Sequence, residues 1–367
     1  MRLPHPLIAG GGPAGSAIAI LLARGGARPM LIERTREAHD VVCGGFLGAD
    51  AIALLGRLGI DVALLGAHPI HRIRVVAGGR EMETHLPFAA AGLSRRTLDA
   101  TMIGMAAREG AAVERGVTVR AIDLAARRLD LADGTVLESD RLFIATGKHD
   151  VRGGGRPVDA PGSDPAIGFR IAITPSPALT TALTGVIELH LFRHGYAGLL
   201  LQEDGNANLC LSIAQSRLRD AGGRPETLIP SLGDAPRLGE RLDMAVSTGS
   251  WSSIARIAYG WRQQTGVDGI FRLGDQAAVI ASLAGDGIAI ALASACRASA
   301  ACLANGPQGA LDFQHGFSRH VRRPLALAGL LRGAGENGRA AGPLIALLGH
   351  CPGLVRLAAS ATRVGSR

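Results

Sequence analysis

The sequence contains few aromatic side chains and a single lysine. Phe, Trp and Tyr make up 3% of its 367 residues. Proteins that bind single-stranded nucleic acids stack bases on aromatic side chains, so this scarcity argues against that class. Lys148 is the one lysine, and arginine carries nearly all of the positive charge. Eight of the arginines and one acid, Glu336, follow position 316, whereas the preceding chain is close to neutral. A basic tail on a neutral body predicts no nucleic-acid partner.

Cysteine is also scarce, and no Cys-x-x-Cys pair occurs among the five cysteines. An odd, scattered set in a chain of this length is typical of reduced thiols, so we expect a cytoplasmic protein. The N-terminus lacks a basic leader followed by a cleavage site, and no signal peptide is expected. The longest apolar run, Ala277–Cys296, has Asp286 at its middle. A carboxylate is costly at mid-bilayer, so this run predicts a buried strand-to-helix element.

Several catalytic signatures are missing. Histidine and cysteine do not occur at metal-ligand spacings, so no metal site is expected. No nucleophile elbow for Ser-His-Asp hydrolysis is present. Glycine is abundant, with 51 residues, but no Gly-X-Y repeat exists, which excludes collagen.

The opening of the chain predicts a βαβ unit. Leu7–Ala9 is a short apolar strand, Ser16–Arg24 is a helix rich in Ala, Ile and Leu, and Met30–Ile32 is a second strand. Between the first strand and the helix lies Gly10–Gly15, which matches the Gly-x-Gly-x-x-Gly pattern of dinucleotide-binding proteins. Glu33 ends the second strand, where an acid accepts hydrogen bonds from ribose hydroxyls.

The glycines of this turn have distinct expected roles. Gly10 permits a tight turn, Gly12 lets the backbone approach a pyrophosphate, and Gly15 allows close packing of helix on strand. The helix N-terminus supplies unpaired N–H groups and a positive dipole end for the phosphates. A purely structural βαβ turn is the alternative. The strand, helix and acid in register favour a dinucleotide site.

A second glycine turn, late in the chain, discriminates between FAD and NAD. Gly274-Asp275 follows the apolar strand Ile270–Leu273, and Gly285-Asp286-Gly287 precedes an Ala-rich helix that extends to about Ala304. Here the chain resembles the single-domain FAD-dependent oxidoreductases of the geranylgeranyl reductase and p-hydroxybenzoate hydroxylase group. The resemblance implies that Asp275 binds the flavin ribityl chain. It also implies that the helix start points N–H groups at the flavin ring, where reduced flavin holds negative charge. A simple turn or helix cap is the alternative role for Asp275.

Two further segments extend the resemblance. Ser94–Asp99 is similar to the group's Arg-x-x-apolar-Asp/His element, which implies that Arg95 lies along the cofactor phosphates or ribityl chain; an exposed helix arginine is the alternative. Cys43-Gly44-Gly45 is similar to a segment of the reductases that runs beside the isoalloxazine ring. Cys43 is then a redox thiol, a substrate contact or a small buried hydrophobe.

Other motifs of the group are absent. The segment His194–Leu199 stands where the reductases have Gly-Tyr-x-Trp-x-Phe-Pro, but the Trp, Phe and Pro are missing. Ala145–Asp150 stands where the hydroxylases have an Asp-Gly motif, which leaves the electron donor open. The Trp-x-Trp-x-Ile-Pro signature of flavin halogenases is absent, which argues against halogenation.

Candidate substrate-side residues lie on predicted strands: His190, His194, Tyr196 and Gln202. Alternate strand positions share a face, so His190 and Tyr196 can both point inward unless Gly195 shifts the register. Cys43, His190 and Tyr196 are the catalytic candidates, although a strand histidine is more often structural. The predicted cofactor-binding residues are Gly10, Gly12, Pro13, Ala14, Gly15, Glu33, Arg34, Cys43, Gly44, Gly45, Arg95, Gly274, Asp275, Gly285, Gly287 and Ile288.

The predicted fold class is α/β: a doubly wound, Rossmann-like FAD-binding domain with an antiparallel-sheet substrate domain and a helical C-terminal segment. The expected divisions are residues 1–70, 91–155 and 266–310 for the FAD-binding domain, 71–90 for a substrate-domain hairpin, 156–265 for the substrate domain, and 311–367 for the basic C-terminal segment. Short apolar helices, including Leu325–Leu331 and Leu344–Leu348, are expected in that segment. It either contacts an anionic membrane or covers an apolar pocket, or it packs on the FAD-binding domain.

These observations predict an FAD-dependent oxidoreductase with a small-molecule substrate. The favoured function is a monooxygenase of secondary metabolism that hydroxylates an aromatic or polyketide-like molecule, with NAD(P)H as the reductant. The alternative is a reductase of an isoprenoid or other alkene. A non-catalytic flavoprotein that acts as a binding partner is the alternative from another class.

Overall fold

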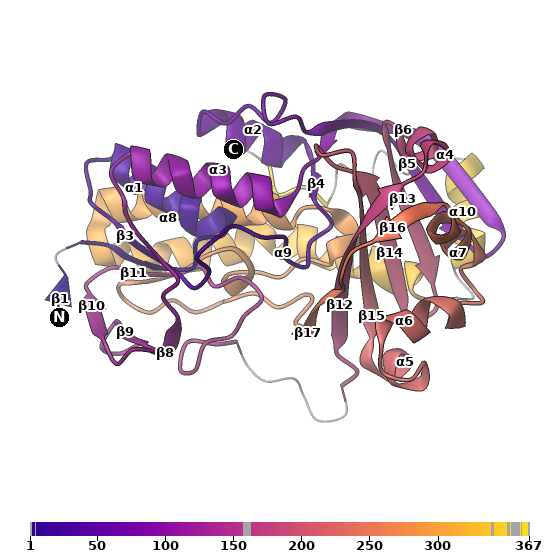
Figure 1. Cartoon of the computed structure of the whole chain (residues 1–367). Helices are drawn as coiled ribbons and strands as arrows, with labels where there is room; N and C mark the ends of the chain where they lie inside the picture. Colours follow the sequence, from indigo (N-terminus) through magenta and orange to yellow (C-terminus); the bar gives the residue numbers. More distant parts are fainter. Residues whose placement is uncertain are drawn as a thin grey trace.

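The computed structural model describes residues 2–3, 5–156, 163–338, 341–350, 353, 360 and 362–365. Figure 1 shows two layers of structure side by side: a parallel sheet covered by helices, and a larger sheet that stands beside it. The predicted α/β fold class is confirmed.

A five-stranded, all-parallel sheet forms the first layer, in the order β18-β11-β2-β3-β7. Its strands are β2 (Leu7–Ala9), β3 (Met30–Glu33), β7 (Ala112–Arg115), β11 (Leu142–Ile144) and β18 (Ile270–Arg272). Strands β2, β11 and β18 are buried along their whole length, which explains why the first two are continuous apolar runs. The chain places β3 and β11 on opposite sides of β2, and ligands of such sheets bind at the carboxyl ends of the strands beside this reversal.

Helices cover one face of the parallel sheet. They are α1 (Pro13–Arg24), α3 (Arg95–Arg108) and α8 (Gly287–Asn305), and α1 packs between the other two. A small sheet of β1 (Arg2–Leu3), β8 (Val119–Asp123), β9 (Arg128–Leu131) and β10 (Val136–Ser139) covers the other face. The main apolar core therefore lies between the parallel sheet, α1 and α8.

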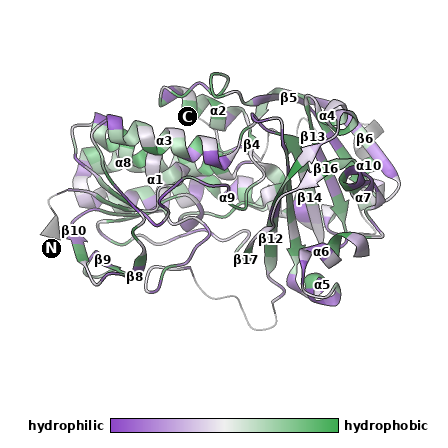
Figure 2. Ribbon diagram, viewed as in Figure 1, coloured by the Kyte–Doolittle hydropathy of each residue, from purple (hydrophilic) through white to green (hydrophobic). Residues whose placement is uncertain are grey.

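The second layer is a nine-stranded sheet whose main order is β16-β12-β15-β14-β13-β5-β6-β4, with β17 paired to β12. Its strands are β4 (Phe46–Leu47), β5 (His68–Ala77), β6 (Arg80–Gly92), β12 (Ala166–Pro175), β13 (Val186–Phe192), β14 (Gly195–Leu201), β15 (Ala207–Ala214), β16 (Ala245–Thr248) and β17 (Ser252–Ile257). The pairing is antiparallel except between β13 and β5, where two distant segments join in parallel. Figure 2 shows hydrophobic colour along β12 and β14 and on the buried helices.

Seven further α-helices complete the described part of the chain. They are α2 (Ala49–Arg57), α4 (Pro177–Leu183), α5 (Gln215–Asp220), α6 (Pro225–Leu228), α7 (Pro236–Asp243), α9 (Gly309–Gly335) and α10 (Ala341–His350). The prediction of a separate short helix at Leu325–Leu331 is wrong, because α9 continues through Pro324. Pro324 and Leu325 are buried against the core, and this packing offsets the hydrogen bond that proline removes. The predicted Leu344–Leu348 helix is part of α10, which packs on β5 and β6; Arg339, Arg356 and Arg367 lie outside the described residues.

One helical stretch, Gly287–Gly335, is long and apolar enough to cross a membrane by length and composition alone. Of its most apolar window, 56% is buried inside the protein. The α8 part packs against α1 and α9, and the core helix of a globular domain meets the same criterion without a membrane.

Candidate functional site

A cavity of about 840 Å³ lies between the two layers, and both predicted glycine turns line it. The early turn contributes Gly10–Ala14, at the carboxyl end of β2. The late turn contributes Gly274–Asp275 and Gly285–Ile288, which follow β18 and open α8. Segments from the two ends of the chain thus meet around one elongated space. Its far wall is the nine-stranded sheet.

The glycines of the early turn differ in what they permit. Gly10 has a φ of +104°, and a Cβ there would overlap the carbonyl oxygen of Ala145. A Cβ on Gly15 would overlap the carbonyl oxygen of Gly10. At Gly12, by contrast, the nearest obstacle is the Arg95 Nη2 atom, 3.4 Å away. Gly10 and Gly15 are therefore required by the fold, whereas Gly12 leaves open a cradle that a phosphate group fits.

Glu33 ties the second strand to this turn. Its Oε2 accepts a hydrogen bond of 2.7 Å from the Gly11 N–H, and its Oε1 accepts bonds from the Thr35 N–H and hydroxyl at 2.9 and 2.8 Å. Arg34 is exposed at the cavity edge, with Nη2 2.8 Å from His149 Nε2. The predicted dinucleotide-binding acid is thus held rigidly at the cavity edge.

Arg95 opens α3 and points into the cavity next to Gly12. Ser94 caps the helix by accepting a hydrogen bond from the Thr97 N–H. The Arg95 guanidinium binds the Asp99 carboxylate through bonds of 2.9 and 2.7 Å, and its side chain is only 15% exposed. Burial opposes its charge, but the Asp99 carboxylate outweighs this effect and raises the pKa of Arg95. The alternative of an exposed helix arginine is wrong, and a fixed cation stands beside the predicted phosphate cradle.

The late turn carries a second fixed pair of charges. Asp275 Oδ2 lies 3.5 Å from Lys148 Nζ, and both side chains line the cavity. The Asp275 carboxylate raises the pKa of Lys148, so the lysine remains charged. Lys148 lies in Ala145–Asp150, the segment that replaces the hydroxylases' Asp-Gly motif.

The start of α8 opens directly onto the cavity. Gly285 has a φ of +76° and packs against the Phe46 ring, whereas a Cβ on Gly287 would meet nothing within 4 Å. Asp286 occupies the N-cap position but makes no capping hydrogen bond with its side chain. The N–H groups of the first turn therefore remain available to an anionic or electron-rich ligand.

Asp286 makes stability depend on pH. It is 4% exposed, and burial raises its pKa to about 7. Between about pH 4 and pH 7 the unfolded chain ionises this carboxyl while the folded chain keeps it protonated, so stability falls as pH rises through this window. We expect the free energy of unfolding of Asp286→Asn to rise relative to that of the parent as the pH increases through this window, by on the order of 2–4 kcal/mol in total. Above pH 7 the difference between the two proteins should stay constant. Urea unfolding at several pH values measures this, and a difference independent of pH would contradict it.

The segment Cys43-Gly44-Gly45 lines the cavity and is held by the large sheet. Asn208 Nδ2 donates to the carbonyl oxygens of Cys43 and Gly44 at 3.0 and 2.8 Å. Asn208 Oδ1 accepts a bond of 2.7 Å from Arg170 Nε. A buried asparagine on β15 thereby fixes the backbone of the predicted ring-side segment. Cys43 and Cys210 are free thiols that both line the cavity, and burial raises the pKa of Cys210 to about 12.

The substrate-side candidates separate into two groups. Of the two residues that could both point inward, Tyr196 lines the cavity and His190 does not. The β13–β14 hairpin places Leu191 opposite Tyr196 and His190 opposite Ala197, so His190 faces the other side of the sheet. His194 lies in the exposed hairpin turn, and Gln202 is buried beside Gly45; neither lines the cavity.

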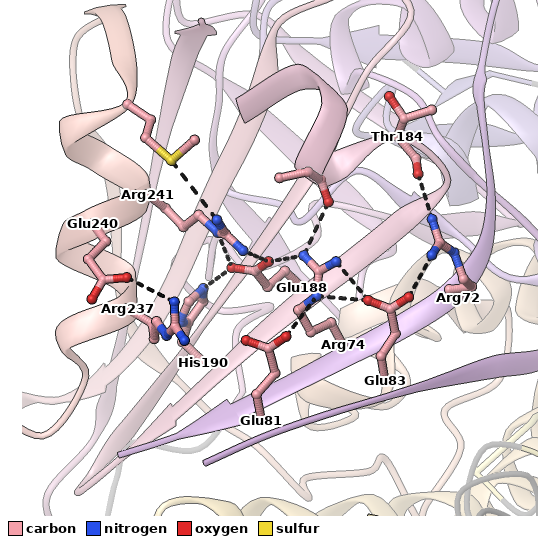
Figure 3. A network of polar contacts seen from close by, with 12 residues as sticks. Arg72, Arg74, Glu81, Glu83, Thr184, Glu188, His190, Arg237, Glu240 and Arg241 are labelled. Atoms are coloured by element: carbon pink, nitrogen blue, oxygen red, sulfur yellow. Dashed lines mark hydrogen bonds and ion pairs between the residues drawn. The ribbon is translucent and has the colours of Figure 1, made fainter. Parts of the chain in front are cut away.

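His190 belongs instead to an ion network on the back of the sheet, drawn in Figure 3. Its Nε2 lies 2.7 Å from Glu188 Oε1. The Glu188 carboxylate is fully buried and pairs with Arg74 Nη1 at 2.6 Å and with Arg241 Nε at 2.9 Å. Burial alone would raise the pKa of Glu188, but hydrogen bonds from His190 and Arg241 lower it well below its usual range. This network joins α7 to the parallel β13–β5 pair behind the cavity wall.

Polar residues of the site that sequence reasoning did not identify include Lys148, Tyr259 and Ser282, which line the cavity. Asn208, which binds the Cys43 backbone from outside the lining, was not identified either. The sequence marks Lys148 only as the single lysine of the chain and gives no sign of a role in the site. Asn208 lies on a strand whose pattern is apolar, where a buried amide signals a specific partner. Tyr259 and Ser282 lie in irregular segments that carry no periodic signal. Among the residues that the structure describes, no cluster of His, Cys, Asp or Glu is arranged to hold a metal ion.

A glycine turn at the end of a parallel strand, an open helix N-terminus and an acid on the next strand define an α/β dinucleotide-binding protein. Residues 5–131 match the model of a family described as "FAD binding domain". This stretch of the chain is similar to an FAD binding domain, and the expectation of FAD as the cofactor is confirmed.

Relatives and solved structures extend this result. Menaquinone reductase of Mycobacterium tuberculosis is 33% identical over 151 residues, which is 38% of this chain and 37% of the relative. The chain thus matches well under half the length of its curated relatives. The crystal structure of Pseudomonas aeruginosa PqsL with 2-aminobenzoylacetate matches 93% of this chain and 98% of its own, at 18% identity and a TM-score of 0.70. A geranylgeranyl bacteriochlorophyll reductase-like protein of Thermoplasma acidophilum matches 94% of this chain and 91% of its own, at 16% identity and a TM-score of 0.75. The fold is shared with both, and the resemblance to this group is confirmed.

Proposed function

We propose that the protein is an FAD-dependent oxidoreductase that acts on a small molecule with a large apolar surface. The single observation that carries this proposal is the cavity, because it joins both glycine turns to an apolar chamber on the large sheet. The chamber walls include Val75, Phe88, Leu189, Leu191 and Leu200. Apolar walls with a few placed polar groups are typical of ligand sites.

The residues of the early and late turns fit FAD, and each is assigned one contact with it. In the proposed site Gly12 and the N–H groups that open α1 bind the diphosphate, with Arg95 as a fixed counter-charge. Glu33 binds the adenosine ribose, Asp275 binds the ribityl chain, and the open start of α8 faces the flavin ring. FAD, when bound, supplies two-electron redox chemistry, whereas the chain supplies position, charge and a water-poor chamber.

Monooxygenation of an aromatic or polyketide-like molecule is the first candidate reaction, with NAD(P)H as the electron donor. The fold shared with PqsL supports it, and so does the loss of the reductases' aromatic segment at His194–Leu199. Reduction of an isoprenoid or other alkene is the second candidate. The relatives named menaquinone reductase and the long apolar wall favour it.

The experiment that tests these reactions begins with the purified, FAD-loaded protein. NADPH or NADH consumption is followed with aromatic and prenylated test compounds, and the products are weighed by mass spectrometry. A product heavier by one oxygen atom, formed with oxygen uptake, supports the monooxygenase. A product heavier by two hydrogens, formed without oxygen uptake, supports the reductase. If neither NADPH nor NADH reduces the flavin, the result favours the non-catalytic flavoprotein and contradicts both proposed reactions.

Three further proposals accompany this function. We place the protein in the cytoplasm, on the grounds of its scattered free cysteines. The basic C-terminal segment is assigned to packing rather than to a membrane, because α9 buries Phe313, Phe317, Val321 and Leu325 in the main core. We also propose that residues 1–70, 91–155 and 266–310 form the cofactor domain, and that residues 71–90 and 156–265 form the substrate domain.

Asp275→Ala is expected to weaken FAD binding by about 1–3 kcal/mol, because it removes an acceptor for ribityl hydroxyls. It also leaves Lys148 without its ion-pair partner. Titration of the apoprotein with FAD, followed by flavin fluorescence, measures the change. Asp268→Ala is the matched control, since Asp268 is 51% exposed and pairs with Arg127. Equal FAD affinity in the Asp275 variant and the parent would contradict the assigned contact.

A further inference from the structure

A cluster of hydroxyl groups lies where the large sheet meets the late glycine turn. Tyr259 Oη lies 2.7 Å from Ser282 Oγ and donates a 3.2 Å bond to Ser212 Oγ. Ser282 opens the short 3-10 helix that runs directly into the Gly285–Gly287 turn. Tyr196 faces Ser212 across the β14–β15 pair and completes the cluster. All four side chains line the cavity.

Tyr196 is the member without a hydrogen bond. The residue is only 5% exposed, and its Oη makes no hydrogen bond of good geometry in the described part of the chain, although the Ser282 and Tyr259 hydroxyls are its neighbours. Leaving a buried donor unpaired costs stability, so such a group in a cavity points to a ligand acceptor. Burial raises the pKa of Tyr196 well above its ordinary value, which keeps the O–H in place as a donor.

The residues around the Tyr196 hydroxyl determine which ligand charge can be accommodated there. The residues that the nine-stranded sheet contributes to the cavity include no charged side chain within the described chain. Arg332 lies behind Tyr259, with its guanidinium 4.4 Å from the ring centroid, but it is bound to Glu336 at 2.6 Å and does not line the cavity. Lys148 also lines the cavity, but its ammonium is paired with the Asp275 carboxylate at 3.5 Å. A carboxylate placed here would therefore lose its hydration without gaining an unpaired cation, whereas a neutral oxygen needs only a donor.

We propose that this hydroxyl cluster is a subsite for a neutral, acceptor-type oxygen, and that it selects uncharged apolar carbonyl compounds over carboxylates. Tyr196 donates to the ligand oxygen, while Tyr259 and Ser282 hold the adjoining wall. The apolar side chains of Val75, Leu191 and Leu283 pack around the same position. This inference rests on the proposed function, because it assigns the substrate class of the same cavity.

Equilibrium dialysis with three matched probes tests the subsite: 2-acetylnaphthalene, 2-ethylnaphthalene, which lacks the oxygen, and 2-naphthoate, which is charged. We expect the ketone to bind about tenfold more tightly than the hydrocarbon and the carboxylate. Tyr196→Phe keeps the ring and removes the donor, so it is expected to abolish this preference while leaving 2-ethylnaphthalene affinity within about twofold. Cys210→Ala, on the same face of the sheet, is the control that keeps the preference.

Ser282→Ala provides a second variant, expected to reduce the ketone preference by about threefold through the loss of the Tyr259 contact. A carboxylate that binds as tightly as the ketone would overturn the inference, and so would a ketone preference that survives Tyr196→Phe. The visible flavin absorption of the same samples is recorded separately. A protein that holds FAD without the ketone preference contradicts this subsite alone. A protein that takes up no FAD contradicts the proposed function, and dialysis still reports on the subsite.

Discussion

Gly12→Val is expected to yield a folded protein that purifies without FAD. The branched side chain fills the cradle assigned to the diphosphate, and only the tip of the flexible Arg95 side chain lies near it in the protein itself. Loss of the close backbone approach should reduce FAD affinity by at least tenfold, or about 1.4 kcal/mol. Flavin absorbance per mole of protein measures the occupancy, and far-UV circular dichroism measures the fold.

Two matched variants separate a local from a global effect. Gly329→Val, at an open position of α9, introduces the same side chain far from the turn and should retain FAD. Gly15→Val should fail to fold, since its side chain would collide with the Gly10 carbonyl. Full flavin occupancy in the Gly12→Val variant would show that the diphosphate does not bind at this turn.

Glu188→Gln is expected to destabilise the protein by about 3 kcal/mol. The substitution keeps the shape but removes the negative charge that faces both Arg241 and His190, and breaking a buried ion network leaves the Arg241 guanidinium without its carboxylate partner. Because the pKa of Glu188 is lowered in the folded chain, its stabilising effect is present above the ordinary glutamate range and is lost as the pH falls below about 4.5. Urea unfolding at pH 7 and at acidic pH measures both effects.

Glu240→Gln serves as the control for this experiment. Glu240 pairs with Arg237 at 3.2 Å, but the two side chains are 57% and 50% exposed. An exposed pair contributes only about 0–1 kcal/mol. Equal losses in the two variants at pH 7 would show that the buried network contributes nothing beyond a surface pair.

Local patterns were sufficient for the elements that hold the cofactor turns. The apolar run before Gly10, the helix after it and the Ser94 cap each depend on near neighbours in sequence, and the structure has them where the pattern indicates. The prediction that the two glycine turns meet at one cofactor came from the family resemblance, because interactions between near neighbours in sequence do not indicate it. The roles assigned to the individual cofactor-binding residues remain predictions.

Contacts between distant strands could not be predicted in the same way. Side chains alternate with a period of two, so the pairing of Leu191 with Tyr196 decides that Tyr196 faces the cavity and His190 does not. Nothing near Asn208 in the sequence indicates that it binds the backbone at Cys43. Pro324 is a local signal for a break, yet burial overrides it.

The parallel pairing of β13 with β5 has a consequence for biosynthesis. The β5–β6 hairpin leaves the ribosome long before β13 is made, so one edge of it has no strand to pair with during that interval. Sheet closure across such a sequence separation is slow, and the nascent chain exposes an aggregation-prone edge while it waits. Production of this protein should therefore respond to chaperone supply and to growth temperature more than its final stability suggests.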